Sequence, residues 1–221
     1  MKKDTIRGHT FIPSYLTNDS YILDLGSHKG EFSLELAKKY DYKKIITIEA
    51  NPELVKITRK NTSSVRDIIV IEGMISSSTN SSSDFYINSN LPEASSAINE
   101  IADEQWWFTE ETNNIDYKPI KRILVSNYNL HDLIKKYEIN EIGLIKMDVE
   151  GSEWDILNNF DENLAKKVKQ ISVEFHDFYG KKYREKSASV IHHLKQLGYK
   201  FEHKPGFWGF GTPYADCIFY K

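Results

Sequence analysis

The chain has 221 residues, of which 40% are hydrophobic and 28% are charged, and this composition excludes disorder along the whole chain. Its net charge of -3 excludes a broadly basic surface, so a nucleic-acid partner, which would need a local basic face, is not expected. Cys217 is the only cysteine, so neither an internal disulfide nor a cysteine-based zinc site can form.

The length predicts a single α/β domain over residues 1–221. No run approaches the about 18 apolar residues of a membrane span, and no apolar signal segment follows the polar N-terminus. We therefore expect a cytoplasmic protein without a membrane span. Residues 1–20 are polar except for an apolar island at 11–16, which we expect to pack over an edge of the domain without a chemical role.

A strand, a glycine turn and a helix are predicted in succession over residues 21–40. The strand ends in Asp24-Leu25-Gly26-Ser27-His28-Lys29-Gly30, and the helix covers roughly 30–40. Two glycines permit a sharp turn and the approach of a ligand, and the helix start offers unpaired N–H groups and a positive dipole end. This pattern predicts a site for a polar or anionic ligand, although a ligand-free tight turn would share it. Because the spacing is not the G-x-G-x-x-G of dinucleotide enzymes, a nucleotide-like ligand other than NAD is favoured.

A second strand is predicted at 44–49, and it ends in a carboxylate. Glu49 follows Gly30 at close to the interval of about 20 residues at which an acid after the second strand accepts ribose hydroxyls. We therefore predict a ribose in the ligand, the alternative being an exposed acid near a helix start. Asn51 is a favourable N-cap and Pro52 a favourable first helical residue, so a helix should begin here.

A third strand at 67–73 is almost wholly apolar, as expected of a parallel sheet with helices on both faces. A short edge strand is expected at 84–87. Residues 80–120 otherwise show no clean period, and we expect an acceptor-side insertion or lid at about this position. The aromatic segments Trp106-Trp107-Phe108 and Phe207-Trp208 would either form a wall for the acceptor or anchor the insertion onto the core.

The later elements continue the alternation of strands and helices and close with a hairpin. They are predicted at 121–125 (strand), 130–137 (helix), 142–150 (strand), 169–176 (strand), 186–197 (helix), and 201–204 with 215–220 (terminal hairpin). This order predicts an open α/β sheet with an antiparallel edge. In such sheets, ligands bind beyond the carboxyl ends of the strands, so the polar residues at the strand ends should converge.

The last five residues of strand 142–150 alternate between charged and apolar side chains, and a second glycine junction follows at Gly151. Period-two alternation places Lys146, Asp148 and Glu150 on one side of the strand. Unpaired charges are costly inside a covered sheet, so we expect this end of the strand to open into the site.

Glu174 and His176 share one side of the next strand in the same way. A carboxylate and an imidazole would then lie within reach of Asp148, which makes general base chemistry available. The alternative is purely structural: Lys146 and Asp148 would form an internal ion pair and His176 would be a satisfied loop histidine.

Three of these segments together resemble the FkbM family of S-adenosylmethionine-dependent methyltransferases. They are Asp24-Leu25-Gly26-Ser27-His28-Lys29-Gly30, Ile48-Glu49-Ala50-Asn51-Pro52 and Ile145-Lys146-Met147-Asp148-Val149-Glu150-Gly151-Ser152-Glu153. The Lys-x-Asp-x-Glu-Gly-x-Glu pattern is the most specific part. The resemblance covers roughly 21–76 and 121–220, and the family usually has Asn where this chain has His28.

The resemblance implies a Rossmann-like class I methyltransferase fold, with a mostly parallel central sheet and an antiparallel C-terminal edge hairpin. It also implies S-adenosylmethionine as cofactor and O-methyl transfer to a hydroxyl of a sugar, glycan or secondary metabolite. The turn would hold the methionine end, Glu49 the ribose and Met74 the adenine. The full set of implied cofactor-binding residues is Asp24, Gly26, Ser27, His28, Gly30, Glu49, Asn51, Met74 and Asp148.

Methyl transfer is an in-line displacement, so the protein mainly aligns the acceptor oxygen and takes its proton. His176 is our preferred general base, and Lys146, Asp148 and Glu174 are orienting groups or alternative bases. Magnesium held by Asp148, Glu150 or Glu174 would be another way to acidify the hydroxyl, although no pattern indicates a metal.

Two other functions are compatible with parts of this pattern. A non-catalytic binding or scaffold protein could retain the methyltransferase fold. An NAD-dependent oxidoreductase is disfavoured by the glycine spacing. The favoured partner is a small-molecule or glycan acceptor.

Overall fold

The computed structural model describes residues 1–89, 92, 95–99, 102, 120–177, 181–204 and 216–221. The aromatic segments 106–108 and 207–208, and most of the predicted insertion, lie outside these residues. None of the helices within the described ranges combines the length and the apolar character needed to cross a membrane.

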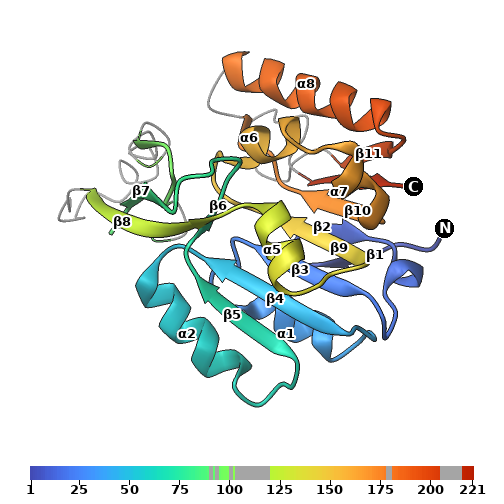
Figure 1. The fold of residues 1–221 in the computed structure, drawn as a ribbon, viewed down its shortest axis with the longest axis horizontal. Helices are drawn as coiled ribbons and strands as arrows, with labels where there is room; N and C mark the ends of the chain where they lie inside the picture. Colours follow the sequence, from blue (N-terminus) through green and yellow to red (C-terminus); the bar gives the residue numbers. More distant parts are fainter. Residues whose placement is uncertain (90–91, 93–94, 100–101, 103–119, 178–180, 205–215) are drawn as a thin grey trace.

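A seven-stranded sheet forms the centre of the protein, in the order β11-β12-β10-β9-β3-β4-β5 (Figure 1). The strands are β3 (Tyr21–Leu25), β4 (Lys44–Glu49), β5 (Ile68–Glu72), β9 (Ile142–Met147), β10 (Gln170–Val173), β11 (Lys200–Lys204) and β12 (Asp216–Tyr220). The five strands from β10 to β5 run parallel, and β12 is antiparallel to both of its neighbours. The predicted open sheet with an antiparallel C-terminal hairpin is confirmed.

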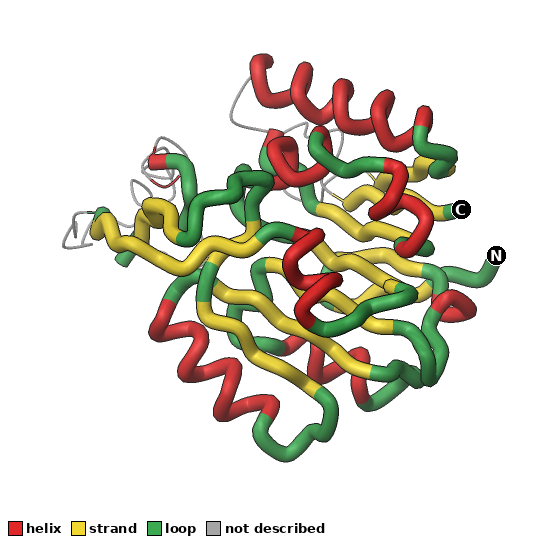
Figure 2. Tube along the Cα trace, in the orientation of Figure 1, coloured by secondary structure: helices red, strands yellow, loops and turns green. Residues whose placement is uncertain are grey.

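Helices cover both faces of this sheet (Figure 2). They are α1 (Glu31–Ala37), α2 (Pro52–Thr62), α5 (Leu130–Lys136), α6 (Glu153–Asn158), α7 (Glu162–Lys167) and α8 (Lys181–Gln196). Successive side chains of β3 point to opposite faces of the sheet. Ile22 packs in one core with Phe32 of α1, and Leu23 packs in the opposite core with residues of α5 to α8. Asp24 therefore shares the α1 face.

Two predicted elements differ from the structure at the margins of the sheet. Strand β5 lies at the sheet edge, where Ile68, Ile69 and Val70 are only half-buried, so its apolar run does not mean full coverage. Helix α8 begins at Lys181, before the predicted start at 186. Its first turn contains one buried anchor, Tyr183, whose ring lies 5.1 Å from that of Trp154, and a single anchor leaves no period to recognise.

A separate three-stranded sheet lies beyond the carboxyl end of β5, in the order β6-β8-β7. Its strands are β6 (Met74–Ile75), β7 (Ser82–Ile87) and β8 (Lys121–Tyr128), and β7 runs antiparallel to β8. Met74, Phe85 and Val125 form a small core with Ala50, which follows β4. The first residues of the predicted insertion, in β7, are therefore paired with the strand that follows it, β8, outside the central sheet.

The N-terminal hairpin packs over the sheet on the α1 face. Its strands are β1 (Asp4–Ile6) and β2 (His9–Phe11), followed by a 3-10 turn, η1 (Pro13–Tyr15). Phe11 joins the core that contains Phe32, and the buried Gln170 side chain of β10 makes hydrogen bonds to both the N–H and the C=O of Ile12. The predicted packing of this segment is confirmed, and it fixes His9 above the carboxyl ends of the strands.

Candidate functional site

The two strand–glycine–helix junctions lie against each other. Gly26, at φ 74°, is so close to the second junction that a Cβ atom there would lie 1.7 Å from the carbonyl oxygen of Asp148. The N–H of Asp148 donates to the carbonyl of Leu25 at 3.0 Å, and the N–H of Gly26 donates to that of Ile48. Only glycine has both the conformation and the space for this contact. Gly26 therefore joins the two halves of the predicted site.

Gly30 serves packing between helices. A Cβ atom at Gly30 would lie 2.9 Å from Cγ2 of Thr58 in α2. The Thr58 hydroxyl donates to the carbonyl of His28 at 2.6 Å, which ties the turn to the same helix. We expected both glycines to admit a ligand, but Gly30 is outside the lining of the cavities described below, so its assignment to the cofactor lacks geometric support.

His28 adopts a left-handed backbone conformation at φ 51°. Asn and His are among the side chains that tolerate this region best. His28 therefore suits the left-handed conformation that this turn requires. The N–H of His28 donates to Oε2 of Glu49 at 2.8 Å, so the turn also fixes the predicted ribose carboxylate.

Glu49 is buried at the end of β4, which excludes the alternative of an exposed acid. Its other oxygen accepts the N–H of Asn51 at 2.9 Å. Burial raises the pKa of Glu49 to about 7, although the hydrogen bonds from Asn51 and His28 act in the opposite direction. The Asn51 side chain itself caps α2 by accepting the N–H of Glu53, and this structural role accounts for its position without a ligand.

The first cavity, of about 180 Å³, lies between the turn, the end of β4 and the small sheet. Glu49 is the buried acid in its wall, and Met74 and Phe85 contribute apolar surface. The complete lining consists of Gly26, His28, Ile48, Glu49, Ala50, Leu54, Gly73, Met74, Ile75, Phe85, Pro92, Ser95, Ala97, Asp148, Val149, Glu150 and Ser152. A mostly apolar wall with a few polar groups is the usual form of a small-molecule site.

A second cavity, of about 160 Å³, lies under the N-terminal hairpin. Gly26, His28 and Asp148 belong to both cavities, so the two meet at the glycine turn. The wall of the second cavity otherwise consists of Arg7, His9, Ser27, Glu31, Phe32 and Lys146, and it is more polar than that of the first. The arrangement suits two ligands that meet beside Asp148.

Lys146 is buried between two carboxylates. Its Nζ lies 3.5 Å from Oδ1 of Asp24 and 3.6 Å from Oδ2 of Asp148, and it donates to the carbonyl of Gly26 at 2.6 Å. Ser33 donates to the other oxygen of Asp24 at 2.7 Å. Burial raises the pKa of Asp148, but the Lys146 ammonium and the nearby imidazoles outweigh it and hold that pKa well below its usual value. The internal ion pair considered from the sequence is present, and Asp148 is an anion.

The predicted strand 142–150 ends at Met147, and the following residues form a turn in which Glu150 has φ 49°. Period-two alternation therefore does not extend to Glu150. Asp148 and Glu150 still face the site because the turn directs them to His176: its Nε2 lies 3.7 Å from Oδ1 of Asp148 and 3.1 Å from Oε2 of Glu150.

His176 is held between two carboxylates. Its Nδ1 lies 2.8 Å from Oε1 of Glu153, on the side opposite Glu150. Burial disfavours the charged imidazole, but Glu150 and Glu153 outweigh this effect and raise the pKa of His176 well above its usual value. An imidazolium with both nitrogens engaged cannot accept a proton. The geometry therefore opposes our prediction of His176 as the general base and supports a positioning role.

The model of the methyltransferase FkbM domain matches residues 24–201. The chain belongs to this family. The FkbM domain identifies it as a methyltransferase and confirms the resemblance inferred from the two glycine junctions.

Three relatives of this FkbM domain protein share 10% to 24% of their aligned residues with it. Methyltransferase sdnD of Sordaria araneosa is 24% identical over 188 residues, which cover 78% of this chain and 72% of that protein. Among solved structures, the methyltransferase FkbM from Methylobacillus flagellatus aligns with TM-score 0.55 at 12% identity over 93% of this chain, which spans 44% of that one. An rRNA methylase from Streptococcus thermophilus aligns with TM-score 0.51 at 10% identity, covering 95% and 90% of the two chains. These structures confirm the class I methyltransferase fold.

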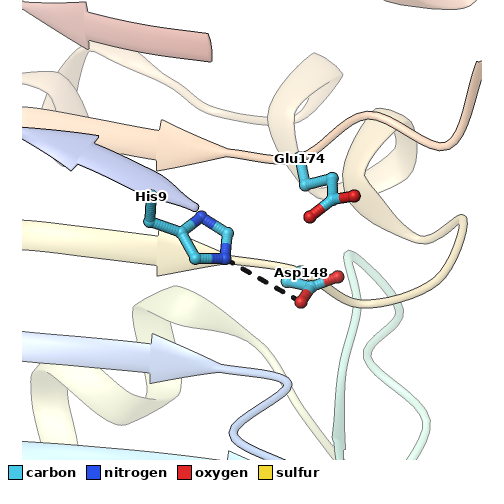
Figure 3. Close-up of side chains that lie close together, drawn as sticks. All are labelled: His9, Asp148 and Glu174. Atoms are coloured by element: carbon cyan, nitrogen blue, oxygen red, sulfur yellow. Dashed lines mark ion pairs between the residues drawn. The ribbon is translucent and has the colours of Figure 1, made fainter. Parts of the chain in front are cut away.

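His9 and Glu153 are among the residues of the site that were not predicted from the sequence. His9 is 3% exposed, and its Nε2 lies 3.8 Å from Oδ2 of Asp148 (Figure 3), so the N-terminal hairpin, to which the sequence assigned no site residue, contributes to the site. Glu153 is fully buried and accepts the N–H groups of Val149 and Gly151 in addition to contacting His176. Glu153 belongs to the Lys-x-Asp-x-Glu-Gly-x-Glu pattern, but it also lies at the start of a helix. An acid is favourable there because of the helix dipole alone, so the sequence did not single it out.

Proposed function

We propose that the protein is an S-adenosylmethionine-dependent O-methyltransferase that acts on a hydroxyl of a small molecule or glycan. In this proposal, residues 1–221 form one domain. The described residues of the predicted insertion that line a cavity are Phe85, Pro92, Ser95 and Ala97, and they line the first cavity, so the expected acceptor-side role of about 80–120 has no support from them. The observation that carries the proposal is the pair of cavities that meet at Gly26 and Asp148. A group-transfer enzyme needs two adjoining ligand sites whose reacting atoms meet at one point.

The first cavity suits the adenosyl part of the cofactor. The Glu49 carboxylate has lone pairs beyond those used by the two backbone N–H groups, and these can accept ribose hydroxyls. Met74 and Phe85 offer apolar surface to the adenine. The methionine end would extend along Gly26 and Ser27 toward Asp148, whose negative charge complements the cofactor's ammonium and sulfonium groups.

The second cavity suits the acceptor. In the transfer step, the acceptor oxygen forms a bond to the methyl carbon as the bond from carbon to sulfur breaks, and the electron pair remains on sulfur. Asp148 and Lys146 would orient the hydroxyl at the junction, and Glu174 borders the same point, while His176 holds Glu150 and Glu153 in place. The proton of the hydroxyl must leave in the same step, either to Glu174, one of the alternative bases predicted from the sequence, or to solvent water at the junction.

Calorimetric titration with S-adenosylmethionine tests the proposal. We expect binding to the wild type, and a loss of roughly tenfold to a hundredfold in affinity for Glu49→Gln, because charge-assisted hydrogen bonds to the ribose are weakened. Glu53→Gln is a matched control, since Glu53 lies in the first turn of α2 with its side chain 75% exposed. An equal affinity of Glu49→Gln and wild type would remove Glu49 from the site, and no binding to the wild type would refute the proposal.

A further inference from the structure

Three side chains with metal-ligand chemistry converge from separate parts of the chain. His9 lies on β2, Asp148 follows β9 and Glu174 follows β10. Ligand atoms of these three residues all lie within 4.8 Å of one another. Figure 3 shows the imidazole of His9 directed at the Asp148 carboxylate, with the Glu174 carboxylate facing the same space.

The contacts within this cluster are too long for direct hydrogen bonds. His9 is 3% exposed, yet its Nε2 lies 3.8 Å from Oδ2 of Asp148, beyond hydrogen-bond distance. Within the described part of the chain, the Glu174 carboxylate has neither a hydrogen-bond donor nor a cationic partner within 4.0 Å. A buried imidazole and two carboxylates at this spacing surround a point from which all three can reach one ion.

The surrounding charges leave a negative excess at this point. Among the described residues, the buried cations Lys146 and His176 face more carboxylates than they can neutralise. Lys146 retains Asp24 and the Gly26 carbonyl as partners, and His176 retains Glu150 and Glu153. Asp148 and Glu174 are the two carboxylates that face His9, and a divalent cation would offset the negative charge gathered here.

A second set of candidate ligands overlaps the first. Asp148, Glu150 and His176 also bring ligand atoms within 4.8 Å of one another. Both nitrogens of His176, however, are already engaged, at 3.1 Å with Glu150 and at 2.8 Å with Glu153. Nε2 of His9 has no such close contact within the described residues, so the set that includes His9 and Glu174 is the one with free coordinating capacity.

We propose that His9, Asp148 and Glu174 bind a divalent cation of the manganese and magnesium class. Two carboxylates and one imidazole suit Mn²⁺, and Mg²⁺ is favoured by the carboxylates. Asp148 lines both cavities, so the ion's open positions would face their junction. If the proposed O-methyl transfer is correct, on which this role rests, the ion would make the hydroxyl of a bound acceptor more acidic. The proton would pass to solvent water at the open junction as the oxygen bonds to the methyl carbon and the carbon–sulfur bond breaks.

Titration with Mn²⁺ tests binding of the ion without any assay of activity. Electron paramagnetic resonance measures free Mn²⁺, so the signal lost on adding protein gives the affinity and the number of sites. We expect one site per chain in the wild type, and at least about tenfold weaker binding in His9→Phe and in Glu174→Gln. His131→Phe and Glu138→Gln are controls outside the site and should bind as the wild type does.

Thermal unfolding in the absence of metal verifies that each variant is folded. Added Mn²⁺ should raise the melting temperature of the wild type and of both controls, but not of His9→Phe or Glu174→Gln. Failure of the wild type to bind at about 1 mM Mn²⁺ would overturn the proposal while leaving the S-adenosylmethionine titration unaffected. Wild-type affinity in His9→Phe combined with weak binding in Glu150→Gln would also overturn it, because the ion would then belong to the other set.

Discussion

The two strand–glycine–helix junctions follow the same local plan but have different contents. At the first, β3 leads through Gly26 and Gly30 into α1, and the glycines are required by close contacts with Asp148 and Thr58. At the second, β9 leads through Gly151 into α6, and the turn holds a buried network of carboxylates around His176. The first junction supplies backbone shape and the second supplies charge. One sequence pattern can therefore serve two physical tasks, and the side chains beyond the glycines decide which.

The largest loss of folding stability is expected from a substitution at the contact between the two junctions. We expect Gly26→Ala to destabilise the fold by at least about 3 kcal/mol, because its Cβ would overlap a backbone carbonyl that cannot move without displacing the second junction. Gly8→Ala is the matched control: Gly8 has φ 85° and no atom within 4 Å of an added Cβ, so only about 1 kcal/mol of backbone strain is expected. Chemical denaturation measures both, and equal losses would show that the junctions are not in contact.

The second largest loss of stability is expected from substitutions in the carboxylate network at the second junction. Glu153→Gln should lower the free energy of unfolding by roughly 2 to 4 kcal/mol, because a buried acceptor of two backbone N–H groups and of His176 is weakened. It should also lower the pKa of His176, which NMR of the imidazole can follow. An unchanged His176 titration would contradict the arrangement, and Glu162→Gln, at the start of α7, is the control.

The same network predicts a pH dependence. The pKa of His176 in the folded protein is raised above 6.5, its usual value. Its imidazolium therefore contributes stability that is fully present below pH 6.5 and is lost as the pH rises through the folded pKa. Glu153→Gln should move this loss to lower pH in denaturation experiments.

At the first junction, Glu49 predicts a pH dependence of cofactor affinity. Its pKa is about 7 in the unliganded protein, so its ionised fraction increases between pH 6 and pH 8. If the ionised form binds the ribose, affinity for S-adenosylmethionine should increase by about tenfold over this range. The effect on stability has the opposite sign, since ionising the buried acid costs stability as the pH rises from 4.5 toward 7. Titrations of Glu49→Gln should show neither trend, and a flat wild-type profile would refute the role.

The smallest effect is expected at Asn51. Asn51→Ala removes the N-cap of α2 and should lower the free energy of unfolding by about 1 kcal/mol. Cofactor affinity should remain within about twofold of the wild type. Asn129, which caps α5 in the same way, provides a matched loss of stability away from the cavities. A tenfold loss of affinity specific to Asn51→Ala would restore Asn51 to the cofactor site.

Local pattern was sufficient to predict the sheet and one half of the site. The strands, the turn at Gly26 and the carboxylate at Glu49 are encoded within short segments whose period and turn residues are visible. Asn51 was recognised as a cap on the same grounds, and that role is the one the structure gives it. Gly30 was the exception, because a glycine that admits a ligand and one that admits Thr58 have the same local pattern.

The charged half depends on contacts between distant segments, which no local pattern encodes. His9 reaches Asp148 only because the N-terminal hairpin packs over β10 and beside α1. The protonation state of His176 depends on Glu150 and Glu153 together, since either acid alone would leave one ring nitrogen without a carboxylate partner. Period-two reasoning failed at Glu150 because β9 ends at Met147 and the chain turns at φ 49°.

A crystal structure with S-adenosylhomocysteine tests the two-part site most directly. We expect the ribose within hydrogen-bond distance of the Glu49 carboxylate and the adenine beside Met74. We also expect the sulfur to face the junction of the two cavities at Gly26 and Asp148. Electron density for the ligand outside the first cavity, or with the ribose away from Glu49, would contradict this arrangement.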